Sequence, residues 1–174
     1  MIPRGSISLT QKHLTRDPTS THQKAEQMRP TVTGVRHLKI WVGDLAAGQT
    51  WYERVLGLTY QFSFQDDDGV VRGVAMALPG TDLQIGLRHD PERAQAMAGA
   101  DPFALRTTID ELDAWVAHLD TLGVPHSPVN KASAGYAVAF SSPDGLQVKL
   151  YADDDTVRAA TIGAYDTVRS IPAP

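Results

Sequence analysis

The sequence predicts an α+β protein in which two βαβββ modules pair, so that curved mixed sheets surround a cleft. Three observations predict this fold class. Strand-like segments with alternating apolar residues are interrupted by two segments with helical spacing. The order of these segments repeats in the second half, and the closing strands match, with LQIGL at 83–87 and LQVKL at 146–150. One such module is too small to bury its own sheet and helix, so the modules must pack together.

The first module is predicted at 34–90. Residues 34–42 alternate and contain β-branched and aromatic side chains, which is typical of a strand. The spacing then becomes helical, with Asp44 as a natural N-cap and Gly57 as a natural stop. Three further strands, separated by turns at DDDG and PG, are predicted at 59–65, 70–78 and 82–88.

The second module is predicted at 101–152. A strand at 103–109 leads into a helix that ends at Gly123. Residues 124–129 contain two prolines and are at best an edge strand. The closing strands are predicted at 135–141 and 145–151.

The two ends of the chain lie outside this repeat. Residues 1–33 are polar and lack a hydrophobic period, so they are predicted to be an arm or extension outside the fold. Met28 could be the true start, or the arm could pack on a partner subunit; Asp17 and Glu26 disfavour a transit peptide. Residues 153–174 are predicted to form a C-terminal helix and tail.

Composition excludes several classes of function. The 174 residues include no cysteine, which excludes disulfides, thiolate metal sites and cysteine nucleophiles. Residues 1–33 carry five basic and two acidic side chains, so the remaining 11 basic and 18 acidic give the body a net charge of −7. An acidic body argues against nucleic acid and favours cationic or neutral ligands. No apolar run suits a membrane span or a secretory signal, so we expect a cytoplasmic protein without a membrane partner.

Several motifs in their observed order resemble the vicinal oxygen chelate superfamily, which includes glyoxalase I, extradiol dioxygenases, fosfomycin-modifying enzymes and bleomycin-resistance proteins. They are H-x6-D-L starting at His37, WYERVLGL at 51–58, the helix DELDAWVAHLDTLGV, and FSSPDGLQVKLY at 140–151. The resemblance covers residues 34–152. It implies the paired-module fold, a small-molecule ligand in the cleft, and a homodimer with shared or exchanged modules.

The resemblance also implies four metal-ligand positions in the metal-using members. His37 matches the first position. The other three fall on Gly86, on Ala104 or its neighbour Phe103, and on Lys149, none of which suits a divalent metal. Because such a metal needs at least three N or O donors, no cofactor is expected.

Substitute metal donors are also conceivable. His89 and Asp90 follow the first module and could coordinate a metal, although HDPER is typical of a solvated loop. A divalent metal therefore stays open as the alternative to a metal-free protein.

His37 and Lys149 are the candidate catalytic residues. His37 could act as a hydrogen-bond partner or general base, or could be an ordinary core histidine. Lys149 could bind an anion or act as an amine, or could be an ion-paired or snorkelling side chain.

Aromatic side chains on the predicted strands would form flat apolar walls, unless they are ordinary sheet core. The candidate ligand-binding residues are Trp41, Phe62, Phe64, Phe103, Arg106, Tyr136 and Tyr151. The helical Trp51, Tyr52 and Trp115 are expected in the core, and His118 and His126 are expected to be exposed.

Three functions remain open. The first is a metal-independent protein that sequesters an aromatic or drug-like molecule, as the bleomycin-resistance branch does. The second is a divergent dioxygenase, lyase or glyoxalase-like enzyme that uses an atypical metal site or His37 and Lys149. The third is a regulatory subunit with a vestigial cleft.

Overall fold

The structure of the protein is a computed structural model that describes residues 30–157. The fold belongs to the unit that begins at Val35. Most of the predicted arm, and the C-terminal helix and tail beyond residue 157, lie outside the described residues. No helix in the described part of the chain is long and apolar enough to cross a membrane.

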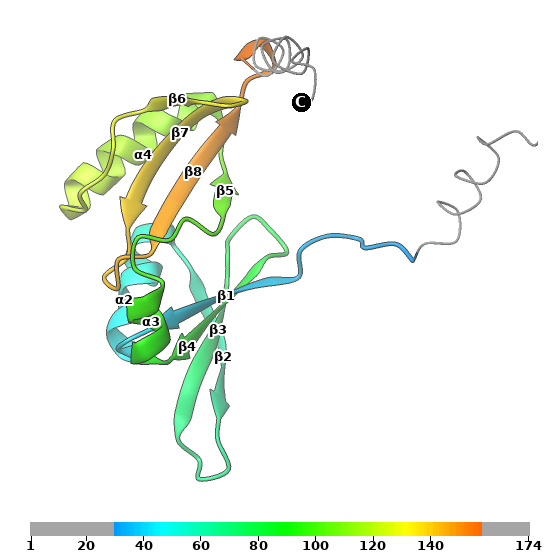
Figure 1. Cartoon of the computed structure of the whole chain (residues 1–174), viewed down its shortest axis with the longest axis vertical. Coiled ribbons are helices and arrows are strands. Elements are labelled where there is room, and N and C mark those ends of the chain that lie inside the picture. The colour runs from blue at the N-terminus through cyan, green and yellow to red at the C-terminus, as the bar shows by residue number, and fades with distance from the viewer. Residues whose placement is uncertain (1–29, 158–174) are drawn as a thin grey trace, which may run out of the picture. The chain divides into compact units, whose positions relative to one another are not determined.

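The first module forms a four-stranded mixed sheet with the strand order β1-β4-β3-β2 (Figure 1). Strand β1 is parallel to β4, and the other neighbours are antiparallel. The strands are β1 (His37–Val42), β2 (Thr59–Gln65), β3 (Val71–Ala77) and β4 (Gln84–His89). Strands β1 and β2 therefore form the two edges of this sheet.

The second module repeats this topology with the order β5-β8-β7-β6 (Figure 1). The strands are β5 (Ala104–Arg106), β6 (Asn130–Ala132), β7 (Gly135–Ser141) and β8 (Gln147–Asp153). An edge strand was at best expected at 124–129, but β6 begins just after this segment, at Asn130. Within 124–129, only His126 forms a β-bridge, and its partner is Phe140. The predicted fold class of two βαβββ modules is confirmed, with two open mixed sheets.

One long helix covers a face of each sheet. Helix α2 (Leu45–Leu56) contacts β3 and β4, and α4 (Ile109–Leu122) contacts β7 and β8. As predicted, Asp44 caps α2 by accepting a hydrogen bond from the Ala47 amide at 2.9 Å. Each helix ends at a glycine in the left-handed region, because a residue with a Cβ is disfavoured there.

A third, short helix replaces a predicted loop. The segment HDPER was expected to be solvated and irregular, but α3 (Pro91–Ala96) begins within it. The Asp90 carboxylate accepts a hydrogen bond from the Arg93 amide at 3.0 Å, and Pro91 suits the first helical turn. The N-cap and the proline in this segment therefore favour a helix, although its polar composition is typical of a loop.

The two modules share one hydrophobic core cluster, formed by the helix-facing residues of both sheets and by α2 and α4. The Trp51 ring of the first module lies 6.2 Å from the Phe140 ring of the second. The Gly43 amide also donates a hydrogen bond to Asp144 Oδ1 at 2.9 Å. Each module is too small to bury its own sheet and helix, so the two must pack together. This packing is present within a single chain.

Candidate functional site

The residues that face away from the helices define the open face of the first sheet. Side chains alternate along a strand, and the pairing register groups the outward ones into three rows across the sheet. The rows are His37–Gln84–Ala77, Lys39–Gly86–Ala75–Phe62 and Trp41–Arg88–Gly73–Phe64. Cationic and aromatic side chains of separate segments are thereby brought onto one surface.

The middle row has a floor of small residues. Gly86 and Ala75 occupy the two central strands, and Lys39 and Phe62 occupy the edge strands on either side. A Cβ added at Gly86 would meet no atom nearer than the Leu38 carbonyl oxygen, at 3.7 Å. Among the described residues, the space above Gly86 is therefore not filled by side chains, whereas Ala75 beside it is only 3% exposed.

Arg88 is held across the next row. Its guanidinium carbon lies 3.5 Å from the centre of the Phe64 ring, which favours a cation–π contact. Gly73 makes this position accessible, because a Cβ there would lie 2.8 Å from Arg88 Cδ. Phe62 meets Phe64 edge to face, with ring centres 5.1 Å apart.

The cations on the open face of the second sheet have carboxylate partners. The Lys149 ammonium contacts the Asp101 carboxylate, and Arg106 Nη2 lies 3.1 Å from Asp153 Oδ2. The Tyr151 hydroxyl accepts a hydrogen bond from the Ala134 amide at 2.7 Å. This arrangement agrees with the ion-paired interpretation of Lys149.

The predicted ligand-binding aromatics fall into two groups. Trp41, Phe62, Phe64 and Tyr151 lie on the open faces. Tyr136 and Phe103 instead pack against the core cluster, and Tyr136 stands opposite the buried Ala152. The alternation in GYAVAFS could have shown this, because Tyr136 shares its face with the buried pair at 138 and 140.

Phe103 and Trp41 nevertheless line one small pocket of about 160 Å³. Its other lining residues are Leu38, Lys39, Ile40, Met97, Pro102 and Leu146. Pockets for drug-sized ligands are usually ~300 Å³ or larger. This pocket alone therefore suits a small group rather than a whole ligand.

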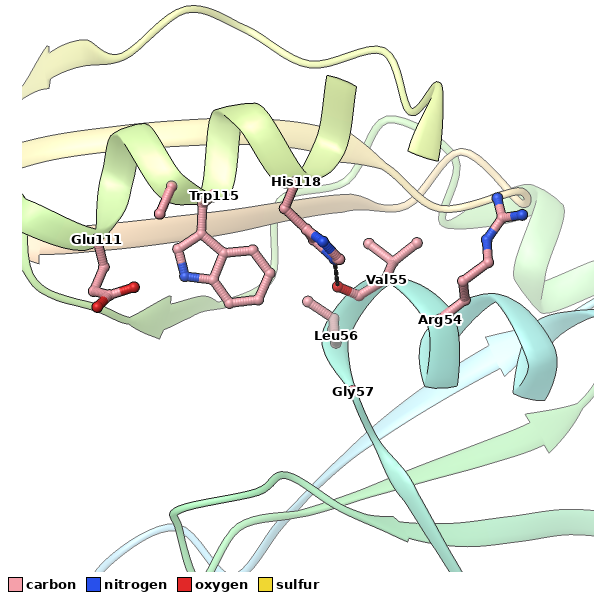
Figure 2. Close-up of a pocket in the computed structure, with 8 residues that line it drawn as sticks. Arg54, Val55, Leu56, Gly57, Glu111, Trp115 and His118 are labelled. Carbon is pink, nitrogen blue, oxygen red and sulfur yellow. Dashed lines mark hydrogen bonds between the residues drawn. The ribbon is translucent and has the colours of Figure 1, made fainter. Parts of the chain in front are cut away.

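A larger pocket of about 320 Å³ lies on the helix side, where the end of α2 meets α4 (Figure 2). Its lining residues are Arg54, Val55, Leu56, Gly57, Glu111, Ala114, Trp115 and His118. A ring nitrogen of His118 lies 3.1 Å from the Val55 carbonyl oxygen, and the Trp115 ring lies edge to face with that of His118. Trp115, which was expected in the core, packs against the core cluster and also lines this pocket.

One further expectation needs correction. His126 was expected to be exposed, but its side chain is only 12% exposed. The ring contacts the Ser127 carbonyl oxygen at 2.8 Å and the Asp120 carboxylate at 3.2 Å, and these contacts, the first more than the second, raise the pKa of His126. The imidazole therefore connects the end of α4 to the segment that precedes β6.

Comparison with known families agrees with this fold. Residues 34–150 match the family described as the Glyoxalase/Bleomycin resistance protein/Dioxygenase superfamily. The chain belongs to this superfamily. No curated protein sequence matches it.

Solved structures of the superfamily's fold resemble the chain at low identity. A glyoxylase/bleomycin resistance protein/dioxygenase domain from Frankia sp. EAN1pec is 20% identical, with a TM-score of 0.58 over 71% of this chain and 100% of that one. The fosfomycin resistance protein FosX from Listeria monocytogenes is 16% identical, with a TM-score of 0.60 over 74% and 98%. The antibiotic binding protein TnmS3 from Streptomyces sp. CB03234 is 23% identical, with a TM-score of 0.60 over 72% and 100%.

The metal-ligand positions implied by the superfamily do not fit a divalent metal in this chain. His37 stands opposite Gln84 rather than Gly86, and Ala104 stands opposite Lys149. One imidazole is thus the only metal donor among the four implied positions. Within residues 30–157, no three His, Asp or Glu side chains are grouped closely enough to hold a metal ion.

Proposed function

We propose that this superfamily member binds and sequesters a small aromatic molecule on the open face of the first sheet, without a metal ion. The observation that carries the proposal is the open space above Gly86, with Phe62 in the same row and Arg88 on the next row. A flat apolar floor with an aromatic wall and a few polar groups suits a planar ligand.

Two further points support this proposal. The four implied ligand positions supply a single metal donor, so the proposed site depends on stacking and hydrogen bonds. A relative of similar fold, TnmS3, is described as an antibiotic binding protein, whereas a FosX structure was solved with Mn(II). A homodimer and a cytoplasmic location stay predictions.

Catalysis by His37 and Lys149 has less support. The two residues lie in different sheets, and the Lys149 ammonium already contacts the Asp101 carboxylate.

The test starts from protein purified without chelators and without metal-affinity steps. We expect elemental analysis to find Fe, Mn, Ni and Zn well below one per chain. A thermal-shift screen of aromatic antibiotics and metabolites, which includes neutral, cationic and anionic compounds, should then find stabilising compounds. Their effect should be the same with and without EDTA, because the proposed site has no metal.

Two matched variants locate the site. Gly86→Phe covers the floor and should abolish the ligand-induced shift while leaving the ligand-free Tm near that of the wild type, because a Cβ has room there. Ala104→Phe makes the same kind of change on the exposed open face of the second sheet and should leave the shift intact. A stoichiometric metal, loss of binding in EDTA, or a screen without any hit would overturn the proposal.

A further inference from the structure

The two open faces differ in how their cations are neutralised. On the second sheet, Lys149 and Arg106 each contact a carboxylate. On the first sheet, no carboxylate within residues 30–157 lies at salt-bridge distance from Arg88 or Lys39. Among the described residues, the first sheet therefore presents two cations without a carboxylate partner.

Arg88 is also positioned in advance. Its side chain is half-buried and lies over Gly73, with the guanidinium against the Phe64 ring. Trp41 stands on the opposite side of Arg88 in the same row. Since a guanidinium held in place loses little freedom on binding, it is suited to a charged, paired hydrogen bond with a planar anion.

The floor and the cations are close enough for one ligand. Gly86 precedes Arg88 by two residues on β4 and is the direct neighbour of Lys39 on β1. Two residues along a strand span roughly 7 Å, which is about the length of a two-ring aromatic system. A planar ring lying over Gly86 would thus have Lys39 on one side and, on the other, Phe62 and the Arg88 guanidinium that lies against Phe64.

We propose that the ligand is a planar aromatic anion, such as an aromatic carboxylate, whose rings lie over Gly86 and whose carboxylate binds Arg88. This inference rests on the proposed function and names its ligand class. It reverses the preference for cationic ligands suggested by the net charge of −7 for residues 34–174. Contact between opposite charges outweighs distant like charges, because salt screens interactions beyond ~8 to 10 Å.

The test compares three probes that share a naphthalene ring: 2-naphthoate, 2-naphthamide and (2-naphthyl)methylammonium. Titration calorimetry at low and moderate salt should show that 2-naphthoate binds at least about tenfold more tightly than the amide, because a charged hydrogen bond is markedly stronger than a neutral one. The ammonium should bind most weakly. Added salt should reduce the advantage of the carboxylate.

Variants separate charge from shape. Arg88→Met should lower the affinity for 2-naphthoate to that for the amide, while the affinity for the amide stays near the wild-type value. Arg72→Met is the matched control, since Arg72 lies on β3, is exposed and pairs with Asp66. It should leave all three affinities unchanged.

The outcomes distinguish this inference from the proposed function. If the amide or the ammonium binds as tightly as 2-naphthoate, or if Arg88→Met leaves the preference intact, the anion inference fails while aromatic binding stands. If Gly86→Phe leaves 2-naphthoate binding unchanged, the location of the floor is wrong. If none of the probes binds and the broader aromatic screen is also negative, the proposed function itself fails.

Discussion

At the scale of single residues, two glycines of the first sheet have opposite roles. A Cβ at Gly73 would lie 2.5 Å from the Leu87 carbonyl oxygen and 2.8 Å from Arg88 Cδ. A Cβ at Gly86 would meet only ordinary contact distances. Gly73 is therefore required by close packing, whereas Gly86 leaves a floor that a larger residue could fill.

We expect Gly73→Ala to lower the free energy of unfolding by about 2 kcal/mol, because the backbone of β4 must shift to admit the methyl group. Gly86→Ala should raise it by about 0.5 kcal/mol, since alanine loses less backbone entropy in a strand. Urea unfolding of both variants checks this pair. Equal effects of the two substitutions would contradict the assigned roles.

At the scale of elements, the two long helices begin differently. Asp44 caps α2 through its carboxylate, whereas Thr108 at the start of α4 makes no side-chain capping bond. Helix α4 has Asp110 and Glu111 in its first turn instead, where negative charge interacts favourably with the helix dipole. The starts of the helices that cover the two sheets thus depend on different interactions.

Asp44→Ala should destabilise the protein by about 1 kcal/mol, because the Ala47 amide loses its partner. Asp44→Asn keeps an acceptor and should recover most of this loss. Thr108→Ala is the control and should change the free energy of unfolding by less than about 0.5 kcal/mol, since there is no bond to lose. A cost at position 108 equal to that at position 44 would refute the capping assignment.

At the scale of the whole molecule, Tyr52 lies where the modules meet. It is 0% exposed, and its hydroxyl lies near Ser142 and Asp144 of the second module without a hydrogen bond of good geometry to the described residues. Burial, with a smaller contribution from the charge of Asp144, raises the pKa of Tyr52 to about 12. The junction between modules therefore favours a neutral phenol.

This raised pKa predicts a loss of stability in alkali. The group has an ordinary pKa of 10.0 in the unfolded chain, so below that pH both states are protonated and nothing is lost. Between pH 10 and pH 12 only the unfolded state releases the proton, and the free energy of unfolding falls by at most about 1.4 kcal/mol per pH unit.

The measurement is urea unfolding from pH 9 to pH 11.5. Tyr52→Phe should weaken the decline relative to the wild type, because phenylalanine has no proton to lose. Tyr60→Phe removes the hydroxyl of a half-exposed residue and should leave the wild-type slope unchanged. Parallel slopes for the wild type and Tyr52→Phe would show that the buried phenol is not responsible.

The fold class, the internal repeat, most of the strands and the ends of α2 could be predicted from the sequence. Alternation, helical spacing, the Asp44 cap and the glycine stops are local signals, so they can be interpreted without the rest of the chain. The same signals placed His37, Phe62 and Phe64 on strands. They failed for α3, where capping by Asp90 turned an expected loop into a helix.

The grouping of side chains on one surface depends on how distant strands pair, so it could not be predicted from local patterns. Strand register brings Arg88 of β4 beside Trp41 of β1 and over Gly73 of β3, although these residues are far apart in the sequence. The fold also brings the Lys149 ammonium against the Asp101 carboxylate, which sequence reasoning could not foresee because 48 positions separate them. Local patterns specify elements, but long-range pairing decides which charged side chains lie close enough to neutralise one another.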